Sequence, residues 1–236
     1  MASGGGTATQ GSMGGSTASM TAYNCEELKA AVEEAHKFDR TATAHCEAYG
    51  SVFNAASAGV DILAHCGFIL PDGERSFDEE VVKLMAEKKL FYNPTLQTGS
   101  ARHDELKRKD QTGNFTSRER DAFEVTGYKF KRKYENMMKM LSLGVEVVAG
   151  SDSTGLGNST RLLRALEMMC EAGMSPIQVI KSATSTSAKA LKIDYNVGSI
   201  REGFIAGLIV VEGGPSKEVS DLRKVKLVMK SGILTS

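Results

Sequence analysis

The sequence predicts an α/β fold in which parallel strands alternate with helices. Two short apolar runs end in the same pair of residues, His45-Cys46 and His65-Cys66, and twenty positions separate the two histidines. This spacing fits one strand, one helix and a second parallel strand. A third apolar run, at residues 144–150, leads into Asp152. If these runs are strands of one barrel, the imidazoles and the carboxylate emerge at the face where barrel enzymes hold their active sites.

The composition is that of a protein with a sizeable core and balanced charge. The chain has 236 residues, of which 41% are hydrophobic and 25% are charged, so it can form one or two domains. Its 29 basic and 29 acidic side chains give no electrostatic case for binding nucleic acid or an anionic membrane surface. No apolar run reaches the roughly 18 residues of a membrane span, and the N-terminus lacks the basic-then-apolar order of a secretory signal. We therefore expect a cytoplasmic protein without nucleic-acid or membrane partners.

The first half of the chain contains the elements that carry the histidines. Residues 1–20 form a loop of low complexity that lacks the glycine-and-lysine order of a phosphate-binding loop. Apolar residues at helical spacing predict a helix over 25–38, with Asn24 as its N-cap. The next segments alternate: strands at 40–45 and 60–65 with a helix at 51–59 between them, a helix at 77–88, and a strand at 90–96 that Pro94 ends or bends.

A charged stretch at about residues 102–139 interrupts this alternation. Glutamates and lysines at i,i+4 spacing predict a solvated helical hairpin there, which could serve as a lid. The strand at 144–150 follows, and the rest of the chain predicts two amphipathic helices and a small antiparallel β element appended to the barrel. These last segments are helices at 160–172 and 175–191 and strands at 204–212 and 225–230.

The four cysteines predict packing rather than chemistry. Cys25, Cys46, Cys66 and Cys170 include no C-x-x-C pair, so the chain has neither a zinc knuckle nor a thioredoxin-type motif. In a reducing compartment such residues behave as small buried hydrophobes. Because neighbouring residues of a strand point to opposite faces, Cys46 and Cys66 should point away from the histidines.

Two histidines and one aspartate at strand ends favour a metal site. A carboxylate at Asp152 can ligate a cation or take a proton from water, although a Ser-Asp-Ser sequence is also an ordinary helix-capping turn. Tyr49, Thr95 and Gln97 also follow strand ends, where they could contact a substrate. Their alternative role is to cap helices and form turns.

The order of these motifs resembles that of the amidohydrolase superfamily. His45, His65, the segment 93–96 and Asp152 match four successive strands of that family. The similarity is to the branch that holds imidazolonepropionase-like hydrolases and Xaa-Pro or Xaa-Arg dipeptidases, and it covers nearly the whole chain. Three further segments strengthen it, at residues 172–176, 183–191 and 198–203.

The resemblance implies a (β/α)8 TIM-type barrel with one or two divalent metals, usually zinc. It assigns His45 and His65 as metal ligands on strands 5 and 6, and Asp152 as the strand-8 aspartate, both a ligand and the catalytic proton shuttle. The family's His-x-His pair and its bridging lysine have no counterpart here, so we expect the C-terminal half of a barrel, strands 5–8. The expected division is a Gly/Ser-rich loop at 1–20, a partial barrel at 21–195 and a C-terminal β-sandwich segment at 196–236.

Three interpretations of the function follow. The first is a metal-dependent hydrolase of amide or peptide C–N bonds, acting on a small-molecule or dipeptide-like substrate. In this interpretation the chain is incomplete, and it needs its missing N-terminal half or forms oligomers. The second is an inactive amidohydrolase fragment that is a remnant or a partner-binding module. The third is an unrelated open α/β binding domain, which the placement of His45, His65 and Asp152 disfavours.

Overall fold

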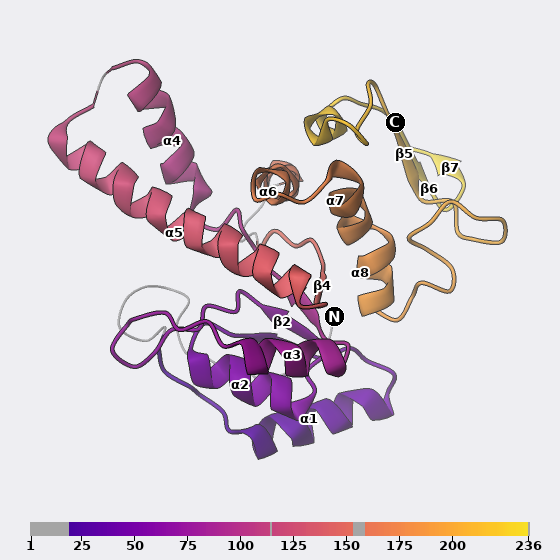
Figure 1. The fold of residues 1–236 in the computed structure, drawn as a ribbon. Coiled ribbons are helices and arrows are strands. Elements are labelled where there is room, and N and C mark those ends of the chain that lie inside the picture. The colour runs from indigo at the N-terminus through magenta and orange to yellow at the C-terminus, as the bar shows by residue number, and fades with distance from the viewer. Residues whose placement is uncertain (1–18, 114, 153–158, 236) are drawn as a thin grey trace.

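The computed structural model describes residues 19–113, 115–152 and 159–235 and contains two β-sheets (Figure 1). The first sheet has four parallel strands in chain order, and the second has three antiparallel strands. At least one helix follows each parallel strand, which confirms the predicted alternation. The parallel strands are β1 (Thr43–His45), β2 (Ile62–Ala64), β3 (Phe91–Asn93) and β4 (Glu146–Val147).

The register of the parallel sheet brings three strand ends to the same level. His45, the last residue of β1, pairs with Ala64 at the end of β2, which pairs with Asn93 at the end of β3. The residues that follow these strands therefore leave the sheet side by side. This is the edge at which the sequence places its candidate site residues.

Three predicted helices lie on one side of the parallel sheet (Figure 1). They are α1 (Cys25–Lys37), α2 (Tyr49–Ala58) and α3 (Glu79–Glu87). As expected, the side chain of Asn24 caps α1 by accepting a hydrogen bond from a backbone amide of the first turn. Helix α2 ends at Gly59, whose φ of 81° lies in the left-handed region that glycine adopts without strain.

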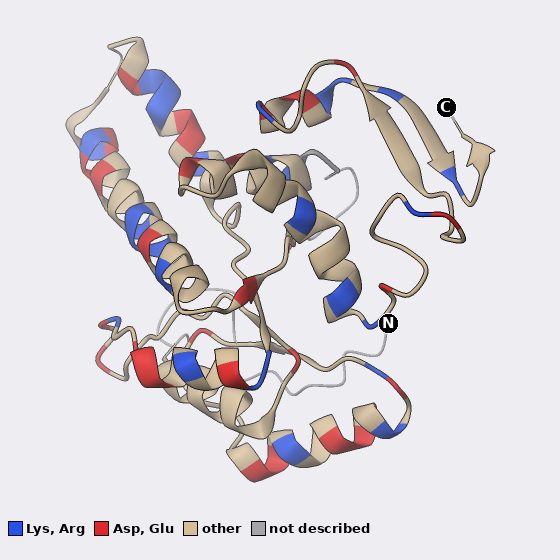
Figure 2. Cartoon of the chain, turned by 45° about the vertical axis from the view of Figure 1, so that its right-hand side comes forward, with Lys and Arg blue, Asp and Glu red and all other residues tan. Residues whose placement is uncertain are grey.

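The charged stretch forms the predicted helical hairpin. Its helices are α4 (Ser100–Gln111) and α5 (Ser117–Ser142), and Figure 2 shows acidic and basic residues alternating along both. A capping box between Thr116 and Glu119 starts α5. Glu119 also accepts a hydrogen bond from Lys109 at 2.5 Å, which ties the two helices together.

The helix predicted over residues 175–191 is wrong as a single element, because the chain breaks at Thr184. There φ is −127° and ψ is −96°, which is not helical. The carbonyl of Ser182 accepts a hydrogen bond from the backbone amide of Ala149, just beyond β4, so it is engaged outside the helix. This tertiary contact favours two short helices over one. The helices after β4 are α6 (Ser159–Glu171), α7 (Pro176–Ala183) and α8 (Ser185–Ala190).

The C-terminal part forms the predicted antiparallel β element, with two additions. A 3₁₀ helix, η1 (Val219–Arg223), and a third strand were not expected, because each is too short to show a periodic pattern. The strands are β5 (Leu208–Val211), β6 (Val225–Lys230) and β7 (Ile233–Leu234).

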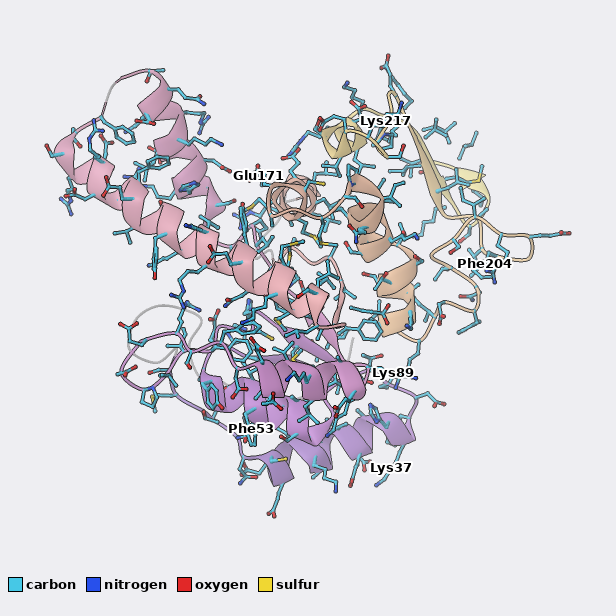
Figure 3. All side chains as sticks on the ribbon, in the orientation of Figure 1. Lys37, Phe53, Lys89, Glu171, Phe204 and Lys217 are labelled. Carbon is cyan, nitrogen blue, oxygen red and sulfur yellow. The ribbon has the colours of Figure 1, made fainter. Side chains whose placement is uncertain are left out.

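One large apolar core joins the parallel sheet to its helices. It runs from Leu28 on α1 through Leu63 on β2 to Val179 on α7 and Val219 on η1. Figure 3 shows side chains filling the space between the sheet and helices α5 and α7. Within the ranges that the structure describes, no helix is both long enough and apolar enough to cross a membrane. The expected division at residues 20 and 195 stays a prediction.

Candidate metal centre

Two histidines and a glutamate converge at the carboxyl ends of β1 and β2. His45 is the last residue of β1, Glu47 follows it by two positions, and His65 comes directly after β2. One ligand atom from each of the three lies within 4.8 Å of the other two. Two imidazoles and a carboxylate are a donor set that zinc and similar divalent cations accept.

The two imidazoles face each other through their nitrogens. The Nε2 atom of His65 lies 2.6 Å from the Nδ1 atom of His45, and the rings meet edge to face at 74°. At this distance one nitrogen donates a proton to the other, and a cation bound by both would replace that proton. The Nε2 atom of His45 is buried and has no hydrogen-bond partner in the described part of the chain. Such an orphaned polar atom calls for a ligand or an ion.

Thr95 and Tyr92 hold His65 in place. The Nδ1 atom of His65 lies 2.6 Å from the hydroxyl of Thr95, and the Tyr92 hydroxyl donates a hydrogen bond to the His65 carbonyl at 3.1 Å. When Nδ1–H donates to Thr95, the lone pair on Nε2 points at His45. A hydrogen bond of this kind fixes both the tautomer and the ring orientation of a metal-binding histidine.

Burial keeps His65 in the form that binds metal. Its side chain is only 8% exposed, and this desolvation lowers the pKa of the imidazole. The nearby carboxylate of Glu47 acts in the opposite direction and raises that pKa. A neutral imidazole is the form that donates a lone pair to a cation.

The backbone is strained at the same strand ends. Thr95 has a φ of 43°, in the left-handed region that β-branched residues rarely adopt. Strain of this kind persists only where the surrounding structure imposes it, and it gathers at functional sites. Of the nine non-glycine residues with positive φ in the described chain, five follow β2, β3 or β4: His65, Cys66, Phe68, Thr95 and Asp152.

The other predicted site residues lie on the segments that follow β1, β3 and β4. Asp152 is exposed and lies outside the group of three, with its carboxylate 3.5 Å from the hydroxyl of Thr98. Its charge still reaches His65, where it raises the pKa of the imidazole. Gln97 is buried, and its Nε2 atom has no partner among the described residues. The Tyr49 hydroxyl donates a hydrogen bond to Asp78 at 2.6 Å, so it is already engaged.

Sequence reasoning did not identify two members of this region in these roles. The sequence patterns do not predict Glu47 as a third ligand of the histidines. Lys133 on α5 was not expected at all, although its spacing from Phe130 and Met137 puts it on the buried face of that helix. Burial lowers the pKa of the Lys133 ammonium, and the charges of Glu47 and Asp152 raise it.

The cysteines next to the histidines are buried, as expected. Cys46 is 0% exposed and Cys66 is 2% exposed, and both belong to the main core. Burial raises the pKa of both thiols. Both thiols therefore resist ionisation in the folded protein.

Comparison with known proteins gives one family and several similar structures. The sequence model of the Amidohydrolase family matches residues 5–234. Ochratoxinase from Aspergillus niger is 28% identical over 211 residues, which are 87% of this chain and 39% of that protein. The chain therefore spans less than half the length of this curated relative.

Two solved structures extend the likeness to the fold. A Xaa-Pro dipeptidase with methionine bound in its active site superposes with a TM-score of 0.75 at 28% identity, over 98% of this chain and 53% of that one. The crystal structure of A. niger ochratoxinase superposes with a TM-score of 0.68 at 25% identity, over 94% of this chain and 48% of that one.

Proposed function

The chain belongs to the amidohydrolase family, and we propose that it is a metal-dependent hydrolase of amide or peptide C–N bonds. One observation carries this proposal: His45, His65 and Glu47 converge at the carboxyl ends of two adjacent parallel strands. The named relatives support the same reaction class, since one is a dipeptidase. The substrate proposed is a small amide or a dipeptide-like molecule.

In this proposal, β1 to β4 are equivalent to strands 5 to 8 of a (β/α)8 barrel. Their parallel pairing in chain order supports this, as does the position of each candidate residue. His45 ends β1, His65 follows β2, and Asp152 follows β4. The equivalence gives the two histidines the roles of the strand-5 and strand-6 ligands and gives Asp152 the role of the strand-8 aspartate.

The residues present fit a divalent cation, and zinc is the proposed one. His45 and His65 would hold it through facing nitrogens, with Glu47 as the nearest carboxylate. The Nε2 atom of His45 is not one of these facing nitrogens, and its lack of a partner among the described residues leaves it available to a substrate group. A bound divalent cation supplies Lewis acidity, which polarises an amide carbonyl and lowers the pKa of water.

The chain's own residues orient the reactants and move protons. Thr95 holds the ring of His65 through Nδ1, so Nε2 stays available. The exposed carboxylate of Asp152 is proposed to accept a proton from the attacking water and to return it to the nitrogen of the leaving amine. The Nε2 atom of Gln97, a buried donor without a partner in the described ranges, is proposed to donate to the substrate.

Zinc uptake and hydrolysis together test the proposal. After dialysis against zinc, we expect the chain to retain the metal, and His45→Ala and His65→Ala to lose it, as measured by elemental analysis. His36→Ala is the matched control, because that histidine is on α1 and bonds Asp61 instead. Unchanged zinc content in both site variants would disprove the ligand assignment.

A second function, that of an inactive partner-binding module, has one observation in its favour. Among the described strands, β1 pairs only with β2, so its other edge is free to pair with another chain. The proposed partner is an N-terminal barrel half or a second copy. Zinc binding without hydrolysis of a dipeptide panel would favour this function over catalysis.

A further inference from the structure

We propose that Lys133 binds a free carboxylate of the substrate, so that the preferred substrates are amides that carry an acidic group. This inference rests on the proposed hydrolase function and adds a substrate class to it. It depends on three observations: the position of Lys133 on its helix, its lack of an ion-pair partner, and the charges of the groups around it.

Lys133 occupies a place in α5 that apolar residues otherwise fill. Phe130, Met137 and Met140 form the buried face of this helix. Lys133 is three residues after Phe130 and four before Met137, so all of them lie on one face. Its side chain is half-buried, and the ammonium lies 5.8 Å from the centre of the Phe130 ring.

The ammonium of Lys133 has no hydrogen bond and no ion pair within the described residues. By contrast, Lys109 and Lys139 each have a carboxylate oxygen within 2.6 Å, and lysines that lack one, such as Lys107 and Lys129, are exposed to solvent. Residues 1–18, 114, 153–158 and 236, which lie outside the described ranges, include no Asp or Glu, so none of their side chains can supply a carboxylate to Lys133. A partly desolvated ammonium without a partner is costly unless a ligand provides one.

The charges near Lys133 favour binding of a substrate carboxylate once a divalent cation occupies the metal centre. Helix α5 reaches the metal centre, because Arg132 donates a hydrogen bond to the Arg75 carbonyl at 3.2 Å and Arg75 donates one to the carbonyl of Gly67, two residues after His65, at 2.7 Å. Burial lowers the pKa of the Lys133 ammonium, the carboxylates of Glu47 and Asp152 raise it, and the charges of Arg75 and Lys129 lower it. Glu47 also belongs to the candidate metal centre, so a bound divalent cation would share its negative charge. Lys133 and the cation would then leave the region with excess positive charge, which a substrate carboxylate neutralises through a short, charge-assisted hydrogen bond.

A pair of probes that differ only in charge tests the inference. N-acetyl-L-leucine carries a carboxylate, and N-acetyl-L-leucinamide carries a carboxamide in its place. We expect the zinc-loaded chain to bind the acid more tightly than the amide by titration calorimetry. In Lys133→Met, affinity for the acid should fall about 10-fold to 100-fold, as when a charged hydrogen-bond partner is removed. Affinity for the amide should stay the same, and Lys133→Arg should keep most of the preference for the acid.

Two controls separate this role from a structural one. Lys131→Met removes an exposed lysine from a different face of α5 and should leave both affinities unchanged. Lys133→Met should keep its zinc and melt at the same or a higher temperature, because it replaces a half-buried charge with an apolar side chain of similar length.

Each contrary result has a distinct meaning. Equal or undetectable binding of the two probes by the zinc-loaded wild type overturns the carboxylate role and leaves the hydrolase proposal standing. Loss of zinc in Lys133→Met also overturns it, because the lysine would then be supporting Glu47. If the wild type takes up no zinc, the hydrolase proposal fails and this inference fails with it.

Discussion

Two histidines in this chain each contact a threonine hydroxyl, but their surroundings differ. The Nδ1 atom of His65 lies 2.6 Å from Thr95, and that of His103 lies 2.9 Å from Thr126. Burial lowers the pKa of both imidazoles. His65 has a second imidazole and a carboxylate beside it. His103 instead stacks on Phe123, with ring centres 5.0 Å apart, and packs between α4 and α5.

The polar groups around the two histidines differ in the same way. A cavity of about 460 Å³ beside His103 is lined by charges that already have partners, apart from the exposed Lys107. Arg164 donates to both carboxylate oxygens of Asp104 and to Glu171, which Figure 3 labels on α6. Near His65, by contrast, the Nε2 atom of His45 has no partner in the described chain. Burial and a threonine contact therefore do not identify a ligand site, whereas convergent donors with unmet hydrogen-bonding capacity do.

The largest expected effect separates the two histidines directly. His65→Phe should lower zinc affinity by about 100-fold or more, because losing a ligand costs more than losing the group that orients it. His103→Phe should leave zinc affinity unchanged and preserve the stacking on Phe123. The Thr126 hydroxyl keeps its hydrogen bond to the Phe123 carbonyl, so no polar group is left unpaired. Competition against a fluorescent chelator measures both affinities, and equal losses would remove the distinction between the two sites.

The next largest effect should distinguish the threonines that contact the two histidines, Thr95 and Thr126, by their influence on zinc affinity. Thr95→Val removes the hydroxyl that orients His65 and should weaken zinc binding by about 10-fold to 100-fold. The replacement is also β-branched, so the left-handed backbone at this position is no more strained than before. Thr126→Val is the matched control in the hairpin, and the same zinc titration should find it unchanged. Wild-type zinc affinity in Thr95→Val would show that packing alone orients the imidazole of His65.

A third comparison asks whether the ion pairs of Arg164 beside the α4–α5 hairpin contribute to stability without affecting zinc affinity. Arg164→Met breaks the contacts with Asp104 and Glu171 and should cost about 1–2 kcal/mol of stability, because the guanidinium is partly exposed. Zinc affinity should not change. Urea unfolding followed by circular dichroism measures the loss. A fall in zinc affinity in this variant would mean that the hairpin supports the site.

The smallest effect is a dependence of the hairpin on acid. The hydrogen bond from Lys109, with those from Thr116, lowers the pKa of Glu119 from 4.5 to about 2. The ionised form is thus favoured in the folded state, and its contribution is complete above pH 4.5 and is lost as pH falls toward 2. Hydrogen exchange should show α4 and α5 losing protection through this window. In Glu119→Gln this loss of protection should be smaller, and the remainder should come from Glu105, whose pKa is lowered by its hydrogen bond with Arg102.

The sequence was a good guide where local patterns decide the structure. The strands that lead to the two histidines, the capped helix after Asn24 and the charged hairpin all have periodic patterns, and each is confirmed, although the second strand ends at Ala64, one residue before His65. The break at Thr184 could not be predicted, because it depends on a hydrogen bond between Ala149 and Ser182 across the fold. The two-residue strand β7 is too short to have a pattern.

The candidate site was predictable in part. Spacing alone predicted that His45 and His65 would meet, and their nitrogens lie 2.6 Å apart. The grouping of Glu47 with them depends on how the chain turns after β1, which no periodicity shows. Lys133 reaches the region from a helix that is distant in sequence. The roles of Asp152, Tyr49, Thr95 and Gln97 stay predictions.

The labelling rates of the buried cysteines report how often the ends of β1 and β2 open. Each of Cys46 and Cys66 adjoins a candidate ligand, and neither thiol can meet a reagent in solution while the core is closed. The rate at which a maleimide labels them therefore counts how often the strand ends open. Cys25 and Cys170 are partly exposed and provide an internal reference for the reagent. A cation bound by the neighbouring histidines would slow maleimide labelling at Cys46 and Cys66 but not at Cys25 and Cys170. The labelling rates would therefore report occupancy of the metal centre without any knowledge of the substrate.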